Sequence, residues 1–169
     1  MLHRPKSAEL NLAASTSHPL GVSSLPKLGD RLLVIFDGHC VLCNGAVRWF
    51  LRRDRRDRLR FAASESLNVA ALLARHRSAA ANVADGPNTI LIVRDFGGSA
   101  EVLLVRSNAA LAMLRELPQP WPAVAAALRL IPRAFRDLVY RIVAGSRTRI
   151  WGRLESCPIP TAEERNRFL

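Results

Sequence analysis

The chain has 169 residues, of which 49% are hydrophobic, so it can bury one core without a framework of disulfides. Its three cysteines are too few and too odd in number for a secreted disulfide scaffold, which favours a reducing, cytoplasmic environment. The formal net charge of +11 attracts nucleic acid and anionic lipid non-specifically, and alone it identifies no partner. Because no apolar run has the length of a signal peptide or a membrane span, we expect neither secretion nor a spanning helix.

Residues 1–30 are rich in Ser, Pro and Ala and contain few large apolar side chains. This composition predicts a flexible leader, with an organelle transit peptide as the alternative. We therefore divide the chain into this leader, a core over 31–118 and a helical extension over 119–169 that packs on the core.

The core begins with a short apolar run over 32–36, which predicts a buried strand. Helical spacing of apolar residues follows over 40–54, and a second strand is expected over 59–63. A further helix is expected over about 64–76, with Ser64 or Ser66 as its N-cap.

Two β-branched runs, residues 89–94 and 101–105, flank a glycine-rich turn and predict a β-hairpin. Ser107 or Asn108 can cap a helix that ends near Leu117. A strand-helix-strand unit followed by a helix, a hairpin and a helix gives a parallel strand pair and an antiparallel hairpin in one sheet. The predicted fold class is α/β, with a thioredoxin-like βαβ-α-ββα core and C-terminal accessory helices.

Two amphipathic helices are expected in the extension, the second beginning after Pro132. Their apolar positions are Val124, Leu128 and Ile131 in the first, and Phe135, Leu138, Val139, Ile142 and Val143 in the second. We expect both helices to pack on the core. The second helix also carries Arg133, Arg136 and Arg141, so a place on a membrane surface is the alternative.

Cys40 and Cys43 lie where the first strand meets the first helix, the position of the active-site C-x-x-C in the thioredoxin fold. The N–H groups at the start of a helix favour a thiolate on Cys40, and Cys43 lies one turn further on the same face. This spacing suits chemistry in which Cys40 attacks a disulfide and Cys43 resolves the mixed disulfide. A pair of buried core cysteines is the alternative.

Asp37 completes the pattern D-x-x-C-x-x-C, and with it the chain resembles the DCC family of thiol-disulfide oxidoreductases. The likeness extends through residues 59–61, 106–110, 132–141 and 157–160. The resemblance implies a thioredoxin-like fold, a redox-active dithiol, and a carboxylate at Asp37 that relays protons or orients the turn. An Asp-Gly turn without a chemical role is the alternative for Asp37. A carboxylate cannot activate a neighbouring thiol, because like charges raise the thiol pKa.

Thioredoxins carry a cis-proline followed by threonine before the strand that faces the C-x-x-C. In this chain Asn88 precedes Thr89, and Pro87 is one residue earlier. We favour Asn88 as the residue that faces the sulfurs, with a shifted Pro87 as the alternative.

His39 can donate to a thiolate on Cys40, or ligate zinc together with the sulfurs of Cys40 and Cys43. Structural zinc normally has four ligands, and Cys157 lies far away in sequence without a second cysteine at metal spacing. We therefore expect no metal site. Cys157 is interpreted as a small buried residue, with a third redox cysteine as the alternative.

A dense group of arginines surrounds the end of the first helix: Arg48, Arg52, Arg53, Arg55, Arg56, Arg58 and Arg60. Cations at a helix C-terminus complement the helix dipole, so a solvated face accounts for part of this group. Trp49 and Phe50 follow core spacing and are not interleaved as a stacking platform, so no specific nucleic acid is expected.

These features predict a thiol-disulfide oxidoreductase that needs no bound cofactor. Its partners would be a disulfide-containing protein or small thiol substrate and an unidentified electron donor. The alternative is a non-catalytic binding module in which the Cys pair is structural or holds zinc and the basic helices engage a partner.

Overall fold

The computed structural model describes residues 27–66, 69, 72, 89–156, 158 and 160–169. Its strands are β1 (Leu32–Phe36), β2 (Leu59–Ala63), β3 (Leu91–Arg94) and β4 (Val102–Val105). Its helices are α1 (Val41–Arg53), α4 (Arg106–Glu116), α5 (Trp121–Arg129) and α6 (Arg133–Trp151), followed by a 3-10 turn at Arg165–Arg167. Residues 1–26 of the expected leader and most of the helix expected over 64–76 lie outside the described residues.

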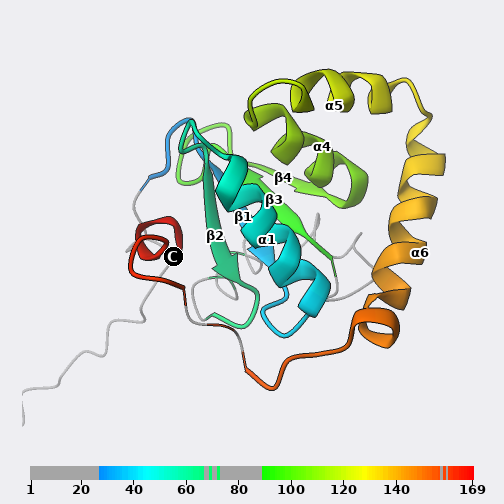
Figure 1. Cartoon of the computed structure of the whole chain (residues 1–169). Helices are drawn as coiled ribbons and strands as arrows, with labels where there is room; N and C mark the ends of the chain where they lie inside the picture. Colours follow the sequence, from blue (N-terminus) through cyan, green and yellow to red (C-terminus); the bar gives the residue numbers. More distant parts are fainter. Residues whose placement is uncertain (1–26, 67–68, 70–71, 73–88, 157, 159) are drawn as a thin grey trace, which may run out of the picture.

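The four strands form one sheet in the order β2-β1-β3-β4 (Figure 1). β1 and β2 are parallel, with Val34 opposite Phe61, while β1–β3 and β3–β4 are antiparallel. The parallel pair and the hairpin predicted from the sequence are both confirmed. The protein therefore has a mixed α/β, thioredoxin-like fold.

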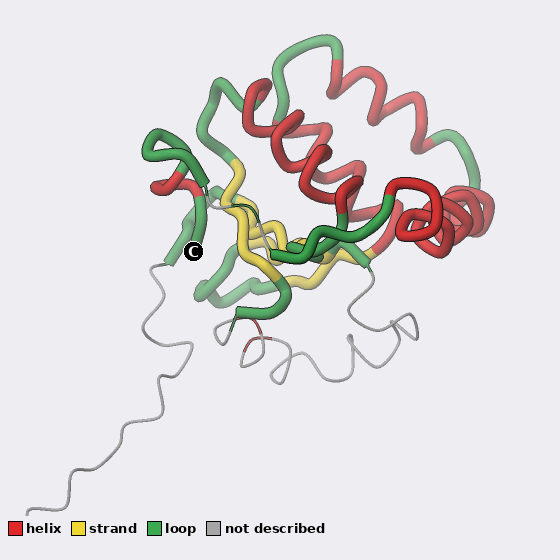
Figure 2. Tube along the Cα trace, turned by 60° about the horizontal axis from the view of Figure 1, so that its bottom comes forward, coloured by secondary structure: helices red, strands yellow, loops and turns green. Residues whose placement is uncertain are grey.

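Both faces of β1 are buried, which accounts for its continuous apolar run. Because successive side chains of a strand point to opposite faces, Leu32, Val34 and Phe36 pack with α1 and α4 on one side of the sheet. Leu33 and Ile35 point to the other side. There they pack with Leu28, Ala62, Val69, Leu72, Leu91, Val93 and Phe96. Figure 2 shows most of the helical segments on one side of the strands.

Two local expectations differ from the structure. Leu28 is buried and its N–H donates to the Phe96 carbonyl at 3.3 Å, so the fold begins before residue 31. The helix α4 begins at Arg106 without a side-chain cap, so the prediction of a cap at Ser107 or Asn108 is wrong. The Ser107 hydroxyl is instead bonded to Asp137 of α6.

The helix α6 packs against α4 and α1, but with its polar side inward. Apolar positions of the helix such as Phe135 and Ile142 remain on the surface, where they are 59% and 63% exposed. The inner side carries Tyr140, Asp137 and Arg147, which bond to polar groups of the core. Buried polar groups need hydrogen-bond partners, and this need decides which side of the helix turns inward.

Within the described part of the chain, none of the helices combines the length and the apolarity needed to cross a membrane.

Candidate functional site

Cys40 occupies the N-cap position of α1, directly after the turn that follows β1. Its backbone is extended, and its Sγ accepts the Cys43 N–H at 3.2 Å, as the side-chain oxygen of a capping serine would. The N–H groups at a helix N-terminus carry partial positive charge, which stabilises negative charge on this sulfur. The structure thus places the sulfur of Cys40 beside the first N–H groups of α1.

Cys40 and Cys43 are free thiols, and both are buried, Cys40 completely. The chain that follows α6 runs beside Cys40. Arg153 forms an isolated β-bridge with Cys40, and the Leu154 N–H donates to the His39 carbonyl at 2.7 Å. We call residues 152–154 the covering segment, because their backbone lies against Cys40 and His39.

The two thiols have different protonation properties. Burial raises the pKa of the Cys43 thiol to about 12, and its hydrogen bond with Cys40 and the charge of Asp37 act in the same direction. The Arg147 guanidinium opposes this shift. Cys43 is therefore a protonated thiol at neutral pH. Its backbone N–H and its S–H both donate to the Cys40 sulfur.

A buried ion pair lies beside the dithiol. Asp37 Oδ2 is 2.9 Å from an Arg147 guanidinium nitrogen, and the two side chains are only 7% and 4% exposed. The other carboxylate oxygen, Oδ1, accepts the His39 N–H at 3.0 Å. Asp37 therefore fixes the turn that leads into Cys40, and α6 supplies its counter-charge.

Sequence reasoning did not identify Arg147, which lies 110 residues after its partner. Tyr140 was also missed. Its hydroxyl is 3.0 Å from Thr89 Oγ1 and accepts the Ile90 N–H at 2.9 Å, so α6 also holds the chain that enters β3. The spacing of seven residues between Tyr140 and Arg147 places both on one side of the helix, and this spacing is the signal that the sequence offered.

Three residues that the sequence analysis singled out lie outside the described residues: Pro87, Asn88 and Cys157.

The turn between β1 and α1 is closed by Asn44. Its Nδ2 donates to the carbonyls of Gly38 at 2.7 Å and Cys40 at 3.0 Å. These bonds, together with the His39 N–H bond to Asp37, fix the backbone on both sides of Cys40.

In the described residues, the side chains of Asp37, His39 and Glu65 form the one cluster of three with the composition of a metal site. It contains neither cysteine. Asp37 already pairs with Arg147, and His39 Nδ1 lies 3.2 Å from Glu65 Oε1. The cationic guanidinium on the same carboxylate opposes a metal cation there, so these residues do not fit a zinc site.

Several arginines of the dense basic group make internal contacts. Arg58 pairs with Glu116 at 3.0 Å and Arg60 with Asp57 at 2.7 Å, while Arg53 lies 4.1 Å above the Trp49 ring. These contacts agree with a structural role for this part of the group.

Cys40 at the N-cap of α1, Cys43 one turn later and the buried ion pair of Asp37 and Arg147 define a dithiol site on a thioredoxin-like fold. The sequence pattern of the DCC1-like thiol-disulfide oxidoreductase family matches residues 34–153, and the chain belongs to this family.

Two relatives cover most of the chain. A DCC family protein of Arabidopsis thaliana, described as chloroplastic, is 31% identical over 137 residues, which is 81% of this chain and 74% of the relative. YuxK, an uncharacterized protein of Bacillus subtilis, is 28% identical over 143 residues, or 85% of this chain and 96% of the relative. No solved structure gives a significant match.

We predict that Arg147→Met destabilises the protein by about 3–5 kcal/mol in urea unfolding, because it leaves the Asp37 charge buried and unpaired. The matched control Arg149→Met, on the exposed side of α6, should change stability by less than about 0.5 kcal/mol. Asp37→Asn combined with Arg147→Met should lose less stability than the sum of the single variants. Additive losses would contradict a direct ion pair.

We predict that Cys43 alkylation reports its raised pKa. With Cys40 and Cys157 replaced by serine, the rate with iodoacetamide should rise with pH up to about pH 10 without a plateau, because the thiolate fraction is still increasing. In guanidinium the same thiol should reach its plateau above its ordinary pKa of about 8.5. A plateau near that value in the folded protein would contradict the burial of Cys43.

Proposed function

We propose that the protein is a thiol-disulfide oxidoreductase that uses Cys40 and Cys43 to exchange electrons with a protein or small-molecule disulfide. The observation that carries this proposal is the Cys40 sulfur at the N-terminus of α1, with the Cys43 N–H donating to it. The family of the chain supports the same reaction class.

In the first step, a thiolate on Cys40 attacks one sulfur of the substrate disulfide. The substrate S–S bond breaks, one substrate thiolate leaves, and a mixed disulfide forms between Cys40 and the other sulfur. The helix N-terminus stabilises the attacking thiolate, and the hydrogen bond from the Cys43 N–H holds its position.

In the second step, Cys43 attacks the Cys40 sulfur of the mixed disulfide. The Cys40–Cys43 disulfide forms, the second substrate thiolate leaves, and two electrons have passed to the substrate. Cys43 must first lose its proton, and its raised pKa makes a nearby base useful. We assign this role to the Asp37 carboxylate, which Arg147 holds in place.

The reaction also runs in reverse, since thiol-disulfide exchange is reversible and its direction depends on the reduction potential of the pair. When the substrate is reduced, a separate thiol or dithiol donor must return two electrons to the Cys40–Cys43 disulfide. A cytoplasmic location fits the cysteine content, and thiol reductants are present there, while one relative is described as chloroplastic.

Trapping the mixed disulfide tests the proposal. Cys43→Ser, mixed with glutathione disulfide, should accumulate one glutathione on Cys40, because the resolving thiol is missing. Cys40→Ser should accumulate far less, and Cys157→Ser should behave as the unmodified protein and form the Cys40–Cys43 disulfide. Mass spectrometry of the quenched proteins reads all three outcomes.

Two results would contradict the proposal. Equal labelling of the Cys40→Ser and Cys43→Ser variants would remove the distinction between the two thiols. Stoichiometric zinc in protein purified without added metal, released when the thiols react, would favour the binding module with a metal-holding Cys pair.

We predict that Leu154→Pro speeds the reaction of Cys40 with glutathione disulfide, about tenfold or more, because proline lacks the N–H that donates to the His39 carbonyl. Leu154→Ala is the matched control, since it shortens the side chain and keeps the N–H. An equal increase in both variants, or none in Leu154→Pro, would show that this hydrogen bond does not limit access to Cys40.

A further inference from the structure

The outer side of α6 is apolar although the helix lies on the protein surface. Phe135, Ile142 and Ile150 are 59%, 63% and 63% exposed. The inner side binds the core through Tyr140 and Arg147 instead. Since monomeric proteins rarely expose a contiguous apolar surface of this kind without a function, this face calls for a partner.

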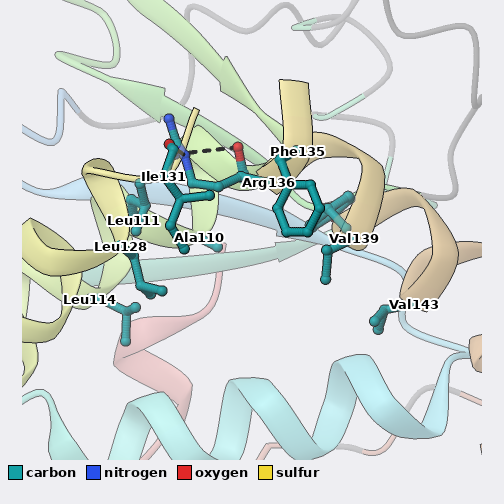
Figure 3. A pocket seen from close by; sticks show the side chains of 11 residues that line it. Ala110, Leu111, Leu114, Leu128, Ile131, Phe135, Arg136, Val139 and Val143 are labelled. Atoms are coloured by element: carbon teal, nitrogen blue, oxygen red, sulfur yellow. Dashed lines mark hydrogen bonds between the residues drawn. The ribbon is translucent and has the colours of Figure 1, made fainter. Parts of the chain in front are cut away.

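The apolar surface continues from α6 over the turn to α5, where Leu130 is 86% exposed. It opens into a pocket of about 330 Å³ between α4, α5 and α6 (Figure 3). Apolar side chains from the three helices point into this pocket, among them Leu114, Leu128, Phe135, Val139 and Val143. We call the exposed outer side of α6, Leu130 and this pocket together the α5–α6 face.

The charges around the α5–α6 face are almost all positive. The two helices and the turn between them contain six arginines and one acidic residue, Asp137, which is bonded to Ser107. The arginines that flank the apolar side chains on the exposed surface are Arg129, Arg133, Arg141 and Arg149. An apolar face bordered by cations is complementary to a surface that is apolar inside and anionic at its rim.

A second copy of the chain fits this face poorly. Pairing two α5–α6 faces would bring the same arginines together in a protein that already carries a net charge of +11. A helix of 19 residues with apolar side chains on one side and arginines beside them has instead the features of helices that lie in the plane of a lipid interface.

We propose that the α5–α6 face binds the surface of an anionic membrane, with α6 lying in the interface plane. Phe135, Ile142 and Leu130 enter the boundary of the acyl chains. Arg141 and Arg149 contact lipid headgroups. This proposal does not depend on the dithiol chemistry, because the residues assigned to the membrane contact are not those assigned to the reaction.

Flotation of the full chain with lipid vesicles tests the proposal. Vesicles of phosphatidylcholine with about 30% phosphatidylglycerol should bind the protein at least about tenfold more tightly than vesicles of phosphatidylcholine alone. Raising the salt concentration should weaken binding, since headgroup contacts are screened. No binding, or equal binding to both vesicles, would overturn the proposal.

Two pairs of variants locate the contact. Phe135→Ser with Ile142→Ser should weaken binding by about tenfold or more, whereas Val102→Ser, at an exposed valine of β4, should leave it within about twofold. Arg141→Gln with Arg149→Gln should weaken binding to a similar extent and reduce its salt dependence. Arg52→Gln with Arg55→Gln removes the same charge from exposed positions near the end of α1 and is the matched control.

Thermal unfolding shows whether each variant is folded. If the variant with both Phe135→Ser and Ile142→Ser does not fold, the variant with both Arg141→Gln and Arg149→Gln tests the proposal. Equal weakening in target and control variants would assign vesicle binding to net charge and overturn the proposal. Sedimentation that shows a stable dimer, dissociated by Ile142→Ser, without vesicle binding would assign the face to a second copy. Binding of an acidic helical peptide without vesicle binding would assign it to a protein partner.

Discussion

The ion pair between Asp37 and Arg147 joins two distant parts of the chain, and the geometry of the site depends on it. Asp37 follows β1 and orients the turn to Cys40, while Arg147 arrives from the last long helix. Both side chains are almost completely buried, so each charge requires the other. The same guanidinium moderates the raised pKa of Cys43. A single contact thus connects the turn before Cys40, the raised pKa of Cys43 and the docking of α6.

The docking of α6 through polar contacts explains its unusual orientation. Tyr140 binds the entrance of β3, Asp137 binds Ser107, and Arg147 binds Asp37. Because all these partners lie on the core, the polar side of the helix turns inward and its apolar side remains on the surface. The helix that supplies Arg147 to the dithiol site is therefore also the helix whose apolar side is exposed. One element combines both features.

The sequence predicted the parts of the fold that depend on local pattern. The apolar run of β1, the helical spacing after Cys40 and the hairpin each reflect neighbours close in sequence, and all three are confirmed. The pattern of α6 also predicted an amphipathic helix correctly, but periodicity does not say whether the apolar side meets a core or another medium. Arg147 could not be assigned because its partner is 110 residues away, and the capping role of Ser107 was replaced by a long-range bond to Asp137.

The most direct test of the account is a redox titration of the purified protein in glutathione buffers, with rapid alkylation and mass analysis of Cys40 and Cys43. The account predicts a reversible two-electron transition that links these two residues, at a potential between about −270 and −120 mV, the range of known dithiol enzymes. A pair that never forms a disulfide over that range, while the protein stays folded, would contradict it.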